Sequence, residues 1–290
     1  NVIYLSPNDR SLIRKASDAS VLLIPAVGPK ISNDIFSKTS LKMVQVTGAG
    51  IDRLDQDFCA RNNIKVCNVL GASAKSVAEY CIFAALTISR RLSKTTDEIL
   101  SGNYKELRGN IIQDRMFSLS GLTLGVIGFG SIGQETAKMF SALGCQIQYY
   151  DPSDPKVAEN LSQIAVKNGK EELLRTSDII SIHVPLIDQT KNLISMQEFS
   201  LMKKTSILLN ASRGGVVDEH ALSQAIQDKK IKGAAIDVFT SEPPEKNNPL
   251  LNLPDEFRDN IILTPHIGGI TAQSWSELFS RSWINIQRFF

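Results

Sequence analysis

Short apolar runs alternate along this chain with longer segments whose apolar residues recur at helical spacing. The runs are rich in valine, isoleucine and leucine and are bounded by turn-forming residues, as buried strands are. They predict strands over residues 2–5, 21–25, 43–47, 64–68, 122–130, 145–151, 178–185, 207–210, 234–239 and 261–265. Strands that alternate with helices build parallel sheets with helical crossovers, so the pattern predicts an α/β fold.

The helical segments also predict how the chain divides into domains. Ser76-Val-Ala-Glu79 has the spacing of a capping box, and the apolar stretch behind it ends in Arg90 and Arg91, cations that suit a helix carboxyl end. The polar residues 93–120 suit a helix crossing between domains and then a loop, and the last twenty residues suit a helix that returns to the first domain. We therefore expect a substrate domain over 1–92 and 270–290, with a cofactor domain over 93–269.

Composition excludes several classes of protein. The 290 residues carry 32 Lys and Arg against 30 Asp and Glu, without a run of five like charges, which argues against a nucleic-acid partner. The four cysteines lack metal-ligand spacing, so we expect no metal site and no disulfide framework. The sequence shows neither a signal-type amino end nor an apolar segment of spanning length, and we expect a cytoplasmic protein with no membrane partner.

A phosphate-binding turn follows the strand predicted at 122–130. Gly128, Gly130 and Gly133 form Gly-x-Gly-x-x-Gly at the start of a helix, where the backbone can approach a pyrophosphate. The next strand ends at Asp151, about twenty residues later, where a carboxylate can bind ribose hydroxyls and repel a 2′-phosphate. This arrangement predicts NAD as the cofactor, and the alternative is a structural glycine turn that binds nothing.

Three later segments each place a reactive side chain at or just past the end of a predicted strand: Arg213, Glu242 and His266. Ligands of open α/β sheets bind at the carboxyl ends of the strands, so we expect these side chains to converge beside a nicotinamide. Each has an ordinary alternative when taken singly: a surface turn for the arginine, a solvated loop for the glutamate and a structural role for the histidine.

Together these segments resemble the NAD-dependent D-2-hydroxyacid dehydrogenase family. The resemblance rests on GFGSIG with Asp151, HVPL at 183–186, NASRGGVVDEHAL at 210–222, GAAIDVFTSEPP at 233–244, TPHIGG at 264–269 and TGAGIDRLD at 47–55, in the family's order. It implies two doubly wound parallel-sheet domains, with a Rossmann-type NAD domain inserted in a smaller flavodoxin-like substrate domain.

The resemblance also implies hydride transfer between NAD(H) and C2 of a small D-2-hydroxy acid or 2-oxo acid. Arg213 would bind the carboxylate, His266 would exchange the hydroxyl proton, and Glu242 would orient the imidazole and favour its protonated form. Implied cofactor contacts are Gly128, Gly130, Ser131, Ile132, Gly133, Asp151, Val184, Pro185, Ala211, Ser212, Asp237, Gly268 and Gly269, and implied substrate contacts are Ala49, Gly50, Ile51 and Arg213. The alternative for Asp237 is a structural partner, and His183 and His220 receive no catalytic role.

Several questions stay open at this point. A non-catalytic NAD(H)-sensing protein, as corepressors of this architecture are, would carry the same arginine, glutamate and histidine. Phosphoglycerate dehydrogenases carry an Arg-Ser pair where this chain has Ile24-Pro25-Ala26-Val27, which disfavours a phosphate-bearing substrate unless Lys30 or Arg53 replaces that arginine. A homodimer through the cofactor domain, and a further strand and helix at the amino end, are expected from the resemblance alone. The individual acid and the physiological direction are not predicted.

Overall fold

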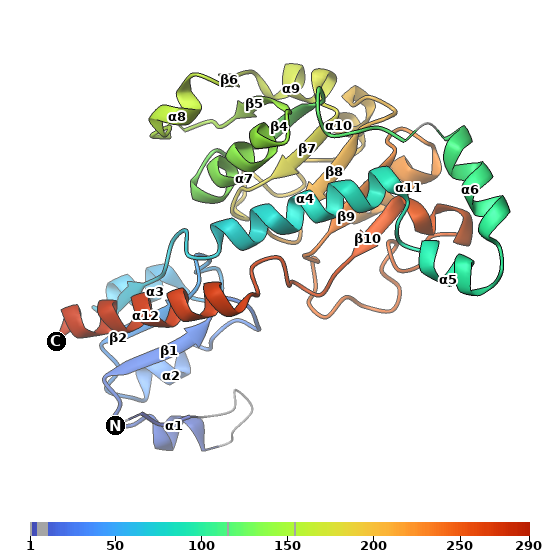
Figure 1. Cartoon of the computed structure of the whole chain (residues 1–290). Helices are drawn as coiled ribbons and strands as arrows, with labels where there is room; N and C mark the ends of the chain where they lie inside the picture. The colour runs from blue at the N-terminus through green and yellow to red at the C-terminus, as the bar shows by residue number, and fades with distance from the viewer. Residues whose placement is uncertain (1, 5–10, 115, 154) are drawn as a thin grey trace. The chain divides into compact units, whose positions relative to one another are not determined.

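The computed structural model describes residues 2–4, 11–114, 116–153 and 155–290. Within these residues the chain forms two compact units, each built on its own parallel sheet (Figure 1). The small unit comprises Asn1–Ser73 and Thr271–Phe290, and the large unit comprises Ala74–Ile270. Both ends of the chain therefore belong to the small unit, and the large unit interrupts it.

The small unit has three described strands, which are parallel and adjacent in chain order: β1 (Val21–Pro25), β2 (Met43–Thr47) and β3 (Lys65–Cys67). Its helices are α1 (Leu12–Lys15), α2 (Asp34–Ser37), α3 (Gln56–Arg61) and α12 (Ala272–Phe289). The returning helix α12 is tied to the loop after β3, because Asn285 donates to the Asn68 carbonyl at 3.2 Å and Arg281 to the Leu70 carbonyl at 3.1 Å.

The strand predicted over residues 2–5 is wrong where it can be checked. Val2, Ile3 and Tyr4 are in no strand and are exposed, and Leu5 lies outside the described residues. The described strands of this sheet follow chain order without a reversal. The finer flavodoxin-like topology of the small unit therefore stays a prediction.

The large unit has seven strands among the described residues, all parallel, in the order β10-β9-β8-β7-β4-β5-β6. They are β4 (Thr123–Ile127), β5 (Gln146–Tyr150), β6 (Ala165–Lys167), β7 (Ile179–Ile182), β8 (Ile207–Asn210), β9 (Gly233–Ile236) and β10 (Ile261–Leu263). From β4 the chain builds outward through β5 and β6, then returns to place β7 on the other side of β4. Such a reversal opens a crevice at the carboxyl ends of the two strands, where this type of sheet binds its ligands.

Helices cover both faces of this sheet, which explains why its strands read as continuous apolar runs. Alternate residues of one strand enter different cores: Ile207 and Leu209 of β8 pack in the core below α4 and α7, whereas Leu208 packs in the core on the opposite face. The helices and the one 3-10 helix are α4 (Ala74–Arg90), α5 (Thr95–Leu100), α6 (Tyr104–Gln113), α7 (Ser131–Ala142), α8 (Glu159–Ser162), α9 (Lys170–Thr176), α10 (Met196–Leu201), α11 (Glu219–Gln227) and η1 (Asp255–Asn260).

The division between the units falls earlier than the sequence predicted. Helix α4 lies within the large unit, because its apolar residues Val77, Cys81, Ala84 and Ile88 are part of the core that α7 and the sheet share. The capping box predicted at Ser76 and Glu79 is wrong, since the helix begins at Ala74 and both residues lie inside it.

Two other details differ from the sequence prediction. The polar stretch 93–120 holds two helices, α5 and α6, and not one, with no buried residue in either. Strand β6 was missed because it is a three-residue edge strand whose side chains are half-buried or exposed, so it leaves no apolar run in the sequence. No helix in the described part of the chain is long and apolar enough to cross a membrane.

Candidate active site

The glycine turn between β4 and α7 has the backbone geometry that a pyrophosphate site needs. Gly128 has φ +90°, and a Cβ there would lie 2.6 Å from the His183 carbonyl oxygen. A Cβ on Gly133 would overlap the Gly128 carbonyl, whereas one on Gly130 would meet nothing within 4 Å. The first and third glycines thus allow close packing, and the second faces open space.

The amino end of α7 is available to an anion. Gly130 is the capping residue of this twelve-residue helix, and no side chain caps its first amides. Unpaired amides and the positive end of the helix dipole stabilise phosphate at such a position. The residues present at this turn therefore fit a dinucleotide.

Asp151 follows β5 and is held against the same turn. Its Oδ2 accepts the Phe129 amide at 2.8 Å, and its Oδ1 accepts the Ser153 amide at 2.9 Å and the Ser153 hydroxyl at 2.6 Å. A carboxylate can accept more bonds than these three, so the fixed Asp151 can also receive hydroxyls of a ribose.

The segment after β7 lies beside the glycine turn, because the His183 amide donates to the Ile127 carbonyl at 2.7 Å. Val184 and Pro185, the implied cofactor contacts, come next in the chain. Burial lowers the pKa of His183 to about 3, and its Nε2 lies 2.8 Å from the Ser181 hydroxyl. A histidine that is neutral throughout the physiological range cannot exchange protons there, which agrees with assigning it no catalytic role.

Asn210, the last residue of β8, shapes the turn that carries Arg213. Its Oδ1 accepts the Ser212 amide at 3.1 Å and the Ser212 hydroxyl at 2.7 Å, and its Nδ2 donates to the Arg213 carbonyl at 3.2 Å. The Arg213 Nη1 donates to the Ser212 carbonyl at 2.7 Å. A Cβ on Gly214 would overlap the Phe239 carbonyl, so this turn passes directly against the chain that follows β9.

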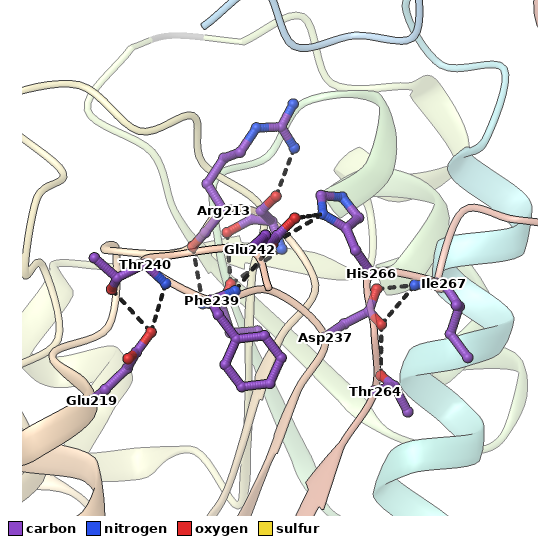
Figure 2. A network of polar contacts seen from close by, with 12 residues as sticks. Arg213, Glu219, Asp237, Phe239, Thr240, Glu242, Thr264, His266 and Ile267 are labelled. Atoms are coloured by element: carbon purple, nitrogen blue, oxygen red, sulfur yellow. Dashed lines mark hydrogen bonds and ion pairs between the residues drawn. The ribbon is translucent and has the colours of Figure 1, made fainter. Parts of the chain in front are cut away.

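Glu242 and His266 form an ion pair from two different loops (Figure 2). His266 Nδ1 lies 2.9 Å from Oε2 and 3.1 Å from Oε1 of Glu242, and Oε1 also accepts the Phe239 amide at 3.1 Å. A carboxylate only accepts hydrogen bonds, so Nδ1 carries a proton and Nε2 is left for another partner. Both side chains are partly exposed, at 22% for the histidine and 27% for the glutamate.

The charge of Glu242 is preserved although the side chain is half-buried. Burial by itself raises the pKa of this carboxyl. The hydrogen bond and positive charge of His266, the Phe239 amide and the charge of Arg213 together outweigh burial and hold the pKa of Glu242 below its ordinary value. Glu242 is therefore ionised at neutral pH and places its negative charge against the imidazole of His266.

Glu219, which the sequence analysis did not single out, connects two of the loops. It lies in the first turn of α11, and its Oε1 accepts the Thr240 amide at 2.7 Å and the Thr240 hydroxyl at 2.9 Å. Its Oε2 accepts the Asn248 side-chain amide at 2.6 Å. Figure 2 shows Glu219 and Thr240 beside Phe239, which lies three residues before Glu242 in the chain. Its only signal in the sequence is its place within NASRGGVVDEHAL.

Asp237 organises the loop that carries His266. This carboxylate is 1% exposed and accepts the Thr264 hydroxyl at 2.6 Å, the Ile267 amide at 2.8 Å and the Gly268 amide at 2.7 Å. The His266 amide donates to the Asp237 carbonyl at 2.8 Å. Asp237 therefore has structural partners, which was the alternative to a cofactor contact, and its contact with a nicotinamide stays a prediction.

The predicted substrate contacts other than Arg213 lie in the small unit. The Ala49 carbonyl accepts the Asn68 side chain at 2.7 Å, and Gly50 and Ile51 follow in the same loop. Arg53 is 5% exposed and donates to the Pro25 carbonyl at 2.6 Å and to the Pro29 carbonyl at 2.8 Å. This arginine therefore holds the loop after β1 and is not an exposed cation that replaces the missing phosphate ligand.

Comparison with known proteins identifies the family. The sequence model described as D-isomer specific 2-hydroxyacid dehydrogenase, NAD binding domain, matches residues 82–268. The chain belongs to the D-2-hydroxyacid dehydrogenase family. This match confirms the predicted Rossmann-type fold and the predicted NAD cofactor of these dehydrogenases, and it covers the glycine turn, Arg213, Glu242 and His266.

Relatives of this chain within the family carry several names. It is 39% identical over 265 residues to a D-3-phosphoglycerate dehydrogenase of Methanocaldococcus jannaschii, spanning 91% of this chain but 48%, about half, of that protein. It is 35% identical over 267 residues to a hydroxypyruvate reductase of Thermotoga maritima, spanning 91% of this chain and 82% of the relative. A D-lactate dehydrogenase from Aquifex aeolicus, solved with NAD and lactic acid, has a TM-score of 0.84 at 31% identity, over 96% of this chain and 84% of that one.

Proposed function

We propose that this chain is an oxidoreductase that transfers a hydride between NAD(H) and C2 of a small D-2-hydroxy acid or 2-oxo acid. The observation that carries the proposal is the ion pair between Glu242 and His266, with the charge of Arg213 acting on the same carboxylate. All three side chains come from loops at the carboxyl ends of strands in one sheet, where such sheets bind ligands.

Residues of the chain itself account for the proton transfer and for the binding of the substrate carboxylate in this reaction. Arg213 binds the carboxylate of the acid through its planar guanidinium. During reduction, the protonated His266 donates the proton on Nε2 to the carbonyl oxygen at C2, and during oxidation it takes the hydroxyl proton back. Glu242 stabilises the positive imidazole and holds its ring through Nδ1. When bound, the nicotinamide supplies the hydride donor or acceptor for C2.

The cofactor contacts are proposed at the residues that the resemblance implies. Gly128, Gly130, Ser131, Ile132 and Gly133 would receive the pyrophosphate, and Asp151 the ribose hydroxyls, as their geometry supports. The remaining proposed contacts to the nicotinamide end are Val184, Pro185, Ala211, Ser212, Asp237, Gly268 and Gly269. Ala49, Gly50 and Ile51 are proposed to contact the substrate carboxylate.

The proposed substrates are small acids without a phosphate group. Arg53, one of the two cations that could have substituted for the arginine absent after β1, is buried and bonded to the carbonyls of Pro25 and Pro29, and Lys30, the other, is exposed. Hydroxypyruvate reductase and glyoxylate reductase are among the names of the relatives, and both names describe small unphosphorylated acids. The relatives' names are those of dehydrogenases and reductases, which favours catalysis over the NAD(H)-sensing alternative.

We propose that the protein forms a homodimer through α5, α6 and the segment that precedes them. Neither helix has a buried residue, although the segment contains several large apolar side chains. They are Leu92, Ile99, Leu100, Tyr104 and Ile112, each at least 49% exposed. Contiguous exposed apolar residues mark interaction surfaces. Leu100→Glu with Ile112→Glu should yield a monomer in light scattering, while Val166→Glu, at an exposed position on β6, should not.

A cytoplasmic location completes the proposal. All four cysteines lie among the described residues, and all four are free thiols. Free cysteines are typical of reducing compartments. Cell fractionation would test the location directly.

The activity is tested by a screen of NADH oxidation against glyoxylate, hydroxypyruvate, pyruvate and bulkier 2-oxo acids, repeated with NADPH and with 3-phosphohydroxypyruvate. We expect turnover of at least one unphosphorylated acid with NADH. Tight NADH binding without turnover of any acid would reject the enzymatic proposal in favour of NAD(H) sensing, and preferred turnover of the phosphorylated acid would reject the substrate class.

A further inference from the structure

Tyr80, on the helix α4, contacts the loop that carries His266. Its hydroxyl lies 2.7 Å from the Thr264 hydroxyl, a contact between residues 184 positions apart in the sequence. Both residues are partly buried. Burial, reinforced by the negative charge of Asp237, raises the pKa of Tyr80, so this hydroxyl keeps its proton at physiological pH. No family motif quoted above includes Tyr80.

The direction of the bond follows from the neighbouring carboxylate. Thr264 has one hydroxyl proton and donates it to Asp237 Oδ1 at 2.6 Å, because an ionised carboxylate can only accept. The Tyr80 hydroxyl must therefore donate to Thr264. The result is a directed chain from Tyr80 through Thr264 to Asp237, in which each bond polarises the next.

The ring of Tyr80 makes a second contact with the same loop. A Cβ on Gly268 would lie 3.3 Å from both Cδ1 and Cγ of Tyr80, so the ring packs directly against the glycine backbone. The Gly268 amide also donates to Asp237 Oδ2 at 2.7 Å. Tyr80 thus contacts the loop at Thr264 and again at Gly268, on either side of His266. Figure 2 shows Thr264 and Ile267 beside the cyan helix, which is α4.

His266 needs this support because its backbone is strained. It has φ +55°, a left-handed conformation that a residue with a side chain adopts at an energetic cost. Such a conformation persists only where neighbouring contacts hold it. Asp237 accepts bonds from the Ile267 and Gly268 amides of this loop, and Tyr80 on α4 contacts the loop at Thr264.

We propose that Tyr80 is a positioning residue for His266, holding the histidine loop through the hydroxyl of Thr264 and the backbone of Gly268. This inference rests on the proposed function only in so far as it concerns catalysis. Held in this way, the loop keeps the imidazole within hydrogen-bond distance of Glu242 and beside C2 of the bound acid. Tyr80 itself touches neither substrate nor cofactor in this role.

The test compares Tyr80→Phe with the wild type and with Tyr4→Phe, a matched change at an exposed tyrosine of the small unit. We expect amide hydrogen exchange in residues 262–270 of Tyr80→Phe to accelerate about fivefold, as loss of one hydrogen bond predicts. With the acid that the wild type reduces best, kcat should fall about tenfold, while KM for NADH changes less than twofold. Tyr4→Phe should change neither measurement.

Two results would overturn the proposal. One is unchanged exchange in residues 262–270 together with unchanged kcat. The other is faster exchange spread evenly over the large unit with a matching fall in melting temperature, which would mean that Tyr80 is only a packing residue. If the wild type reduces no 2-oxo acid, the proposed function fails, and the exchange measurement still decides whether Tyr80 anchors the loop.

Discussion

His266 Nδ1 lies 2.9 Å from Glu242 Oε2, although the two residues are 24 positions apart in the chain. The segment between them contains η1 and strand β10. Just before this segment, Thr240 donates both its amide and its hydroxyl to Glu219. The pair is therefore positioned from two sides, by Glu219 on the glutamate loop and by Asp237 on the histidine loop. Its geometry depends on packing that extends beyond the two side chains themselves.

His266→Ala should abolish proton transfer while leaving the cofactor site intact. We expect kcat to fall by about 10² to 10⁴, the usual contribution of a positioned acid or base. The dissociation constant of NADH should stay within about threefold, because the glycine turn and Asp151 are formed by other segments. Steady-state kinetics and NADH fluorescence titration measure the two effects. An equal loss of affinity and rate would contradict the assigned role.

Glu242→Gln keeps the shape of the side chain and removes its charge. The pKa of Glu242 is held below its ordinary value, so in the wild type the charge is present at neutral pH and is lost only as the pH falls below the usual carboxyl range. Without this charge Nδ1 of His266 loses its charged acceptor, so kcat for reduction should fall about tenfold while the affinity for NADH stays the same. An unchanged kcat would show that the charge of Glu242 does not contribute to proton transfer.

Asp151→Ser tests the choice between NADH and NADPH. Removing the carboxylate abolishes its repulsion of a 2′-phosphate, so the preference for NADH over NADPH should fall by at least about tenfold. NADH binding should also weaken, because the Phe129 amide loses its acceptor. The control is Asp188→Ser, at an exposed carboxylate after β7, which should leave both affinities unchanged. An undiminished preference for NADH would place the discrimination elsewhere.

We expect the large unit to lose stability in acid, because Glu198 then becomes protonated and loses its charge. This carboxylate is 9% exposed, and its pKa is below the ordinary value because bonds from Ser195 and the bond and charge of Lys170, at 2.9 Å, outweigh the effect of burial. A lowered folded-state pKa means that the stabilisation is complete above the unfolded-state pKa and is lost as the pH falls through the folded value.

The corresponding variant is Glu198→Gln, measured by urea unfolding at several pH values. It should be less stable than the wild type by about 1 to 2 kcal/mol at pH 7, the range for hydrogen bonds to a charged group. The difference should shrink below about pH 4.5, where the wild-type carboxyl is protonated in the unfolded chain. A difference independent of pH would mean that shape, and not charge, stabilises the site. Lys38→Gln, in an exposed pair of the small unit, serves as a control with little expected effect.

Much of the large unit could be predicted from local sequence. A strand covered on both faces must be apolar at successive positions, which is why β4, β7 and β8 were visible as runs. The glycine turn was equally readable, because its first and third glycines meet steric demands of the backbone and the second faces open space. The order of the motifs then indicated which strand ends carry reactive residues.

Tertiary structure decided the contacts that no local pattern encodes. Four such contacts join segments at least twenty residues apart: the packing of α4 on the large unit, the bonds from Thr240 to Glu219, the bonds from Arg53 to the end of β1 and the loop after it, and the contact of Tyr80 with Thr264. Such pairs exist only after the crossovers have packed, because the spacing of residues along the chain constrains neighbours within an element and not partners on different elements. The sequence by itself therefore determined the fold class and the reactive side chains, and the folded chain decided how those side chains are held.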